Sequence, residues 1–93
     1  VLDLRTISPV DWEAVMESVE RTKRAIVVHE AHLTLGLGAE IAARLHEALF
    51  YVMESPVLRV AGYDIPYPPA RVESQFLPGV DRILDAVDQS LAY

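Results

Sequence analysis

Cysteine is absent from this chain of 93 residues, which excludes disulfides and thiolate metal sites. Long apolar runs are missing too, since no stretch approaches the roughly 18 residues of a membrane span. Basic residues are few: 8 Lys and Arg stand against 14 Asp and Glu, for a formal net charge of −6. Because nucleic-acid binders draw affinity from Lys and Arg on phosphates, this balance argues against a nucleic-acid partner. It is compatible with a basic protein partner or with plain solubility.

The residues that are present suit one folded domain. Apolar residues make up 52 % of the chain and charged residues 24 %, close to an ordinary soluble protein. The first residues, Val-Leu-Asp-Leu, begin in mid-strand, a pattern typical of a fragment. We therefore expect residues 1–93 to form a single, partial domain of a longer subunit.

One stretch, residues 24–42, organises the chain. Ala25–Val28 is continuously apolar and β-branched-rich, which predicts a strand covered on both faces. A helix opened by Gly36 and Gly38 follows after a loop. These glycines allow conformations that a Cβ would forbid, and they let the helix begin close to the sheet. A strand, a glycine turn and a helix make half of a βαβ unit.

The flanking residues predict further elements. Val1–Arg5 alternates as a strand, and Ser8 and Pro9 are a helix cap and a first helical residue. That helix should end near residues 22–24, with Trp12, Val15, Met16 and Val19 on its apolar face.

The second half of the chain continues the alternation. The helix from Gly38 should stop at residues 54–56 and precede a strand over residues 57–60. Residues 64–69 hold three prolines and predict an extended connection, and residues 71–77 predict a loop or helical turn. A last helix follows Pro78, with Arg82 and three aspartates facing water. Its predicted apolar stripe is Val80, Ile83, Leu84, Val87 and Leu91. Strands alternating with helices predict an α/β three-layer sandwich with a mostly parallel sheet.

The glycine turn invites a phosphate-binding interpretation, because helix N-terminal amides attract anions. The dinucleotide fingerprint G-x-G-x-x-G is not met, since position 41 is Ile, and Glu40 puts a negative charge where an anion would sit. A stand-alone α/β module that binds phosphate or a nucleotide therefore remains the alternative function.

Polar residues around the strand end give no clear active site. His29 and His32 lie three apart across a strand end, with no third ligand for a metal. Glu30 is either a general acid or base, or an acceptor for backbone N–H groups of the glycine loop; the latter is favoured. We predict no catalytic, cofactor-binding or metal-binding residue, and a structural turn at Gly36, Gly38 and Glu30.

Four motifs in order resemble the C-terminal domain of the beta subunit of 2-oxo acid dehydrogenases of the branched-chain or pyruvate type, a domain with the transketolase C-terminal fold. The resemblance covers nearly the whole chain. The motifs are Leu2-Asp3-Leu4-Arg5-Thr6-Ile7-Ser8-Pro9-Val10-Asp11, Val27-Val28-His29-Glu30-Ala31, Gly36-x-Gly38-Ala39-Glu40-Ile41-Ala42 and Pro56-Val57-Leu58-Arg59-Val60-x-Gly62-Tyr63-Asp64-x-Pro66-Tyr67-Pro68.

The resemblance implies a parent enzyme that oxidatively decarboxylates a 2-oxo acid and passes the acyl group to a lipoyl arm. Thiamine diphosphate and magnesium would be bound by the alpha subunit and the preceding domain of the beta subunit, so this segment should bind neither and be inactive alone. The enzyme would act in a bacterial cytoplasm or a mitochondrial matrix.

The implied partners are the alpha subunit, a second beta subunit, and the basic peripheral subunit-binding domain of the acyltransferase core. In pyruvate enzymes an acidic residue before the Pro-x-x-Arg-Val strand and the terminal carboxylate meet that basic domain. The matching docking residues here are Glu54 and Tyr93.

The resemblance also implies a strand and helix of the same domain ahead of Val1. That strand would lie between the strands matching Val1–Arg5 and Ala25–His29. Without it, backbone groups and apolar surface are left bare. We expect such a fragment to pair its strands anew or to associate with another copy.

Two residues, His32 and Leu35, depart from the Pro and Gly usual in the glycine loop of relatives.

Overall fold

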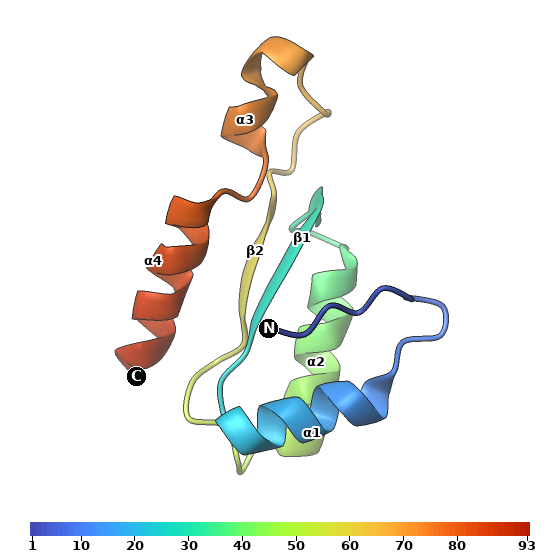
Figure 1. Ribbon diagram of the computed structural model, residues 1–93, viewed down its shortest axis with the longest axis vertical. Coiled ribbons are helices and arrows are strands. Elements are labelled where there is room, and N and C mark those ends of the chain that lie inside the picture. Colours follow the sequence, from blue (N-terminus) through green and yellow to red (C-terminus); the bar gives the residue numbers. More distant parts are fainter.

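The computed structural model describes residues 1–93 and contains two strands and four helices (Figure 1). None of the helices combines the length and the apolar character needed to cross a bilayer. The elements in chain order are α1 (Trp12–Thr22), β1 (Ile26–His32), α2 (Leu37–Leu49), β2 (Leu58–Gly62), a single 3₁₀ turn (Ala70–Val72), α3 (Glu73–Phe76) and α4 (Val80–Leu91).

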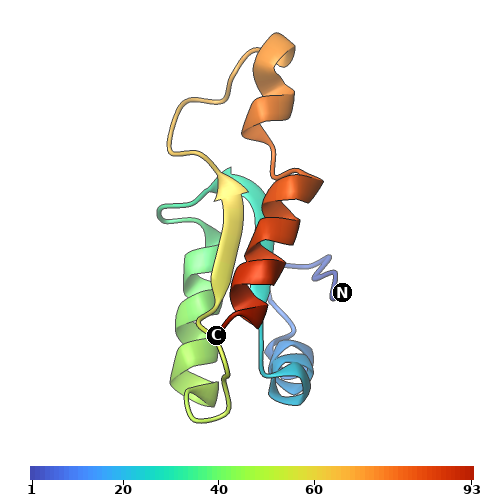
Figure 2. The same ribbon diagram turned by 90° about the vertical axis from the view of Figure 1, so that its left-hand side faces the viewer.

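The two strands run parallel, with Ile26 opposite Leu58 and Val28 opposite Val60. The pairing is irregular beyond Val28 and resumes at His32, opposite Gly62. Helix α2 covers one face of this small sheet and α4 the other (Figure 2). The predicted α/β class and its three layers are confirmed, although the sheet has only two strands.

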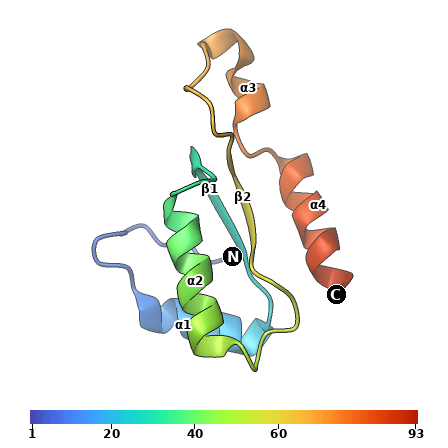
Figure 3. The same cartoon turned by 180° about the vertical axis from the view of Figure 1, so that it is seen from behind.

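The core lies where α1 crosses the base of α2 (Figure 3). Val15 and Val19 of α1 are buried against Ile41, Leu45 and Leu49 of α2. Both sets recur at the three- and four-residue spacing of one helix face, so the apolar periodicity predicted these contacts correctly.

Helix α1 begins later than predicted. Its N-cap is Asp11, whose carboxylate accepts a hydrogen bond from the Ala14 backbone N–H at 3.1 Å. Ser8 and Pro9 therefore lie outside the helix. A carboxylate is a strong N-cap because it also carries negative charge to the positive end of the helix dipole.

Helix α2 ends at Leu49, five residues before the predicted stop at Glu54. Phe50 and Tyr51 follow as a turn, with their rings edge to face at 5.3 Å. The helix therefore ends before it reaches Pro56, the helix-breaking residue of the predicted stop.

The predicted strand over Val1–Arg5 is wrong, because these residues form no strand and pair with none. Val1 and Leu2 are exposed, and Arg5 has a positive φ of 55° that interrupts an extended backbone. An open groove of about 620 Å³ separates this segment from β1. Mostly apolar side chains of α1, α2 and both segments line the groove.

Strand β1 is longer and less covered than predicted. It continues through Glu30 to His32, yet none of its residues is fully buried and Val28 is 44 % exposed. Only β2 pairs with it, so its second edge faces the groove rather than another strand. A run of β-branched residues favours a strand, whereas the burial of that strand depends on which other elements pack against it. The run itself does not specify those elements.

Helix α4 is turned relative to the predicted orientation. Ala86 and Ser90 are its buried residues, while three members of the predicted apolar stripe, Val80, Leu84 and Leu91, are mostly exposed. Arg82, predicted to face water, is half-buried. Its guanidinium donates a 2.6 Å hydrogen bond to the Ala61 carbonyl.

The proline segment is extended as predicted, and a helical turn follows it. This part rises above the carboxyl ends of the strands (Figure 1). It is anchored by Phe76, which is buried and meets the rings of Tyr63, Tyr67 and His32 edge to face. The Tyr67 hydroxyl donates to Glu73, a bond that raises the pKa of Tyr67 to about 12.

Candidate docking site

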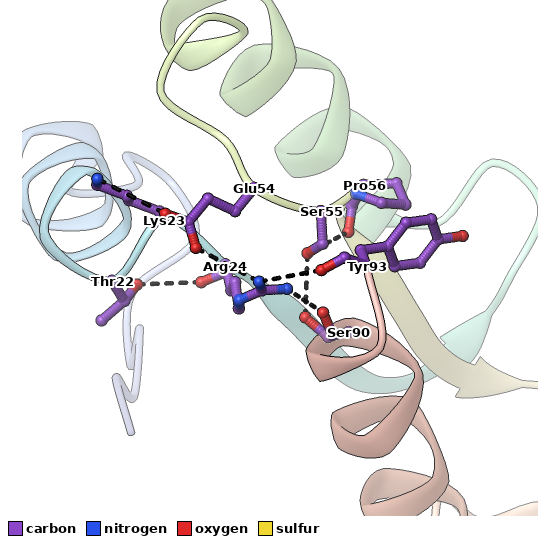
Figure 4. A network of polar contacts seen from close by, with 8 residues as sticks. All are labelled: Thr22, Lys23, Arg24, Glu54, Ser55, Pro56, Ser90 and Tyr93. Carbon is purple, nitrogen blue, oxygen red and sulfur yellow. Dashed lines mark hydrogen bonds and ion pairs between the residues drawn. The ribbon is translucent and has the colours of Figure 1, made fainter.

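The two predicted docking residues, Glu54 and Tyr93, are brought together by Arg24 (Figure 4). The Arg24 guanidinium donates to the Glu54 carboxylate at 3.3 Å, to the Tyr93 backbone oxygen at 3.5 Å, and to the Ser90 carbonyl. We call Lys23, Arg24, Glu54, Ser55, Ser90 and Tyr93 the Arg24 cluster.

Local backbone geometry places the cations of this cluster. Lys23 ends α1 in a left-handed conformation, with φ 61°, so the chain turns there into the segment before β1. The Glu54 backbone N–H donates to the Lys23 carbonyl at 2.9 Å. The side chains of the two residues also meet, with Nζ 3.6 Å from Oε1. Glu54 is thus held at both its backbone and its carboxylate.

A buried pair of hydroxyls fixes the end of α4 beside these charges. The Ser55 and Ser90 Oγ atoms lie 3.0 Å apart, and Ser55 also donates to the Pro56 carbonyl. Both serines are almost fully buried, so each hydroxyl needs a protein partner. This pair ties the segment before β2 to the last turn of α4.

The side chains of the Arg24 cluster carry two positive charges, on Lys23 and Arg24, against the one negative charge of Glu54. The Glu54 side chain is half exposed and already has two cations within ion-pair distance. Arg24 is the more buried of the two, with 23 % of its side chain exposed. An incoming cation would therefore have to share Glu54 with Lys23 and Arg24. Sequence reasoning missed Arg24 and Ser90, because contacts between residues 24, 54 and 90 follow no local pattern.

The glycine turn is built by His29 rather than by Glu30. The His29 Nε2 accepts a hydrogen bond from the Gly38 backbone N–H at 3.0 Å, and its Nδ1 lies 3.1 Å from the Ala31 carbonyl. Glu30 is exposed and its side chain makes no hydrogen bond, so the predicted role of Glu30 in the loop is wrong. Neighbouring residues of a strand point to opposite sides, and only His29 faces α2.

Gly36 and Gly38 are required because the start of α2 lies close to β1, and not because either glycine has an unusual φ. Gly36 is the N-cap of α2 with φ −76°, and no glycine in the chain has a positive φ. A Cβ on Gly38 would fall 2.5 Å from the His29 Nε2, and one on Gly36 would strike the His32 carbonyl oxygen. The prediction that glycine lets the helix begin close to the sheet is confirmed.

The start of α2 offers little to an anion. The Gly38 amide is bonded to His29, and the Ala39 amide donates to the Gly36 carbonyl at 3.0 Å. No group of three or more His, Asp and Glu side chains is arranged to hold a metal. These contacts weigh against the alternative of a phosphate-binding module.

A pair of hydrogen bonds, here called the Asp64 clamp, joins the β1–α2 loop to the segment after β2. The Asp64 carboxylate accepts from the Thr34 hydroxyl at 2.5 Å and from the Thr34 backbone N–H at 3.0 Å. These bonds favour the ionised carboxylate and hold the pKa of Asp64 below its usual 3.8, with the charge of His32 adding to the effect.

We expect acid to open this clamp. A carboxyl with a lowered folded pKa contributes stability above its unfolded pKa, and that contribution is lost as pH falls through the folded value. Urea unfolding at a series of pH values below about 4 should show a smaller loss for Asp64→Asn than for the wild type. Asp85→Asn, at an exposed aspartate without a hydrogen bond, is the control. Parallel curves for wild type and Asp64→Asn would contradict the clamp.

The sequence profile of the transketolase C-terminal domain matches residues 1–83. The chain belongs to the transketolase C-terminal domain family. This transketolase C-terminal domain is 50 % identical over 91 residues to the 3-methyl-2-oxobutanoate dehydrogenase subunit beta of Mycobacterium tuberculosis. It is 52 % identical over 93 residues to the pyruvate dehydrogenase E1 component subunit beta of Leifsonia xyli, and 40 % identical over 93 residues to that of Staphylococcus epidermidis.

The alignments cover 98 to 100 % of this transketolase C-terminal domain. They cover 26, 28 and 29 % of the three relatives, so the chain spans between a quarter and a third of their length. The resemblance to beta subunits of branched-chain and pyruvate dehydrogenases is thereby confirmed.

Proposed function

We propose that this chain is the assembly and docking domain of a 2-oxo acid dehydrogenase beta subunit, and that its Arg24 cluster receives the basic subunit-binding domain of the acyltransferase. The observation that carries the proposal is the meeting of Glu54 and Tyr93 at one guanidinium. Two residues 39 positions apart that resemblance alone linked to docking lie in a single cluster, and both of them are exposed.

The parent enzyme would decarboxylate a 2-oxo acid oxidatively and acylate a lipoyl group, in a bacterial cytoplasm or a mitochondrial matrix. We propose that thiamine diphosphate and its magnesium are held outside this chain. The Gly38 and Ala39 amides at the start of α2 bond within the chain, and no group of three metal-ligating side chains is present. We assign cofactor binding to the alpha subunit and to the rest of the beta subunit, and the chemistry lies outside this domain.

The domain also has a surface suited to assembly. The groove between residues 1–7 and β1 is lined mainly by apolar side chains, and the second edge of β1 is unpaired. The resemblance implies a strand of the beta subunit between the same two segments. We propose that the rest of the beta subunit fills this groove, which would cover the apolar lining and satisfy the free backbone groups of β1.

Replacing Glu54 tests the docking proposal. Calorimetry of the complete beta subunit, assembled with its alpha subunit, against the acyltransferase's subunit-binding domain should show binding that weakens with salt. Glu54→Gln removes one charge and should raise the Kd about tenfold. Glu40→Gln is a matched control, because Glu40 is equally exposed and is also ion-paired, with Arg44 at 2.7 Å.

Two results would overturn the proposal. The first is an assembled wild-type enzyme that shows no saturable binding. The second is a Glu54→Gln variant that binds as tightly as Glu40→Gln. Thermal unfolding of both variants separates a lost contact from a lost fold, because Glu54 also contacts Lys23 and Arg24.

A further inference from the structure

Helix α4 carries a straight apolar row on its outer side. Val80, Leu84 and Leu91 are 69, 54 and 64 % exposed, and the half-buried Val87 completes the row. Their spacing of four, three and four residues places them on one helix face, along about 16 Å of the axis. We call these four residues the α4 row. Apolar side chains exposed in such a line mark an interaction surface more often than isolated ones do.

A row of acids runs beside the α4 row. Asp81, Asp85 and Asp88 are all exposed, and none of them forms an ion pair. The only basic residue of the helix, Arg82, is turned inward, with its guanidinium 4.6 Å from the centre of the Tyr63 ring. The outer side of α4 therefore combines an apolar row with uncompensated negative charge on one flank.

The α4 row and the proposed docking cluster both reach the C-terminal end of α4. Leu91, the last member of the row, lies between Ser90 and Tyr93, and both of these accept hydrogen bonds from Arg24. Tyr93 is itself 69 % exposed. A partner seated on the Arg24 cluster is therefore close to Leu91, at the C-terminal end of the α4 row.

We propose that the outer side of α4 is the second half of the docking surface, and that it binds an amphipathic helix with an apolar row flanked by Lys or Arg. The inference rests on the proposed function and places that helix in the same basic subunit-binding domain. Charge selects this occupant over a second copy of the chain. Two α4 helices packed antiparallel about a two-fold axis would bring their acid rows side by side, whereas a basic flank would pair with them.

The test uses the complete beta subunit assembled with its alpha subunit, titrated with the acyltransferase's subunit-binding domain. The double variant Leu84→Gln/Leu91→Gln should raise the Kd by roughly tenfold to a hundredfold at low and high salt alike, because it removes apolar contact. Leu35→Gln, at a leucine that is 98 % exposed on a distant loop, should leave the Kd unchanged.

The acid row is tested by changing its charge alone. The triple variant Asp81→Asn/Asp85→Asn/Asp88→Asn should bind more weakly and with a flatter salt dependence. Helix α1 offers a matched control, since Glu13, Glu17 and Glu20 are exposed acids with the same four- and three-residue spacing. Changing those three to Gln alters net charge equally and should spare binding.

Each outcome separates the inference from the function on which it rests. A wild-type enzyme that does not bind the domain overturns both. Normal binding that Glu54→Gln weakens, but that neither α4 variant alters, overturns the inference and leaves the docking function standing. Light scattering that shows the α4 variants falling apart, with binding per subunit unchanged, assigns the row to subunit contact and likewise overturns the inference.

Discussion

Leu45→Ala is expected to cost this protein about 2–5 kcal/mol of unfolding free energy. Leu45 is 1 % exposed and is the largest side chain that is completely buried. It sits where α2 meets α1, so the deletion leaves a cavity between two helices rather than at a surface. Small domains have only about 5–15 kcal/mol in total, so the variant loses a large share of its stability.

Urea unfolding followed by circular dichroism measures this loss. Leu84→Ala removes the same atoms from the middle of α4, where the side chain is 54 % exposed, and should cost less than about 1 kcal/mol. Equal losses for the two leucines would mean that the core does not lie between α1 and α2.

Gly36→Ala is expected to cost about 3 kcal/mol, at the upper end of overpacking in a tight site. The new Cβ would strike the His32 carbonyl oxygen and approach the His29 Cε1 to 2.9 Å. The first obstacle is backbone, which cannot rotate away as a flexible side chain does. Relief requires moving the β1–α2 loop, and with it the His29–Gly38 hydrogen bond.

Gly79→Ala is a closely matched control for that change. Both glycines are helix N-caps with similar extended backbones, φ −76° and ψ 163° for Gly36 against φ −86° and ψ 173° for Gly79. A Cβ on Gly79 meets nothing within 4 Å. The preference for glycine over alanine at an N-cap is common to both, so the difference in unfolding free energy isolates the clash. A difference near zero would contradict the tight turn.

The spacing of apolar residues correctly predicted which face of α2 is buried. Ile41, Leu45 and Leu49 are buried as their spacing indicates, because a helix face is fixed once the helix is known. The orientation of α4 was not predictable in the same way. Its apolar residues cover more than one face, and contacts with β2, chiefly through Arg82, decide which face turns inward.

Contacts between distant residues limited the prediction of the site. Glu54 and Tyr93 came from resemblance, yet the residue that joins them, Arg24, is 66 positions from Ser90 and no local spacing records that contact. The prediction of the side chain that accepts from the glycine turn was wrong by one position. Because strand neighbours alternate in direction, choosing Glu30 over His29 moved the acceptor to the wrong side of β1.

The unpaired edge of β1 has a consequence for handling the isolated chain. Half of the peptide groups of a strand with a single neighbour remain open to any extended segment that approaches them. The frequency of encounters between molecules rises with protein concentration, whereas contacts within one molecule do not depend on concentration. The amount of protein in solution is therefore a variable that every physical measurement on this chain must control.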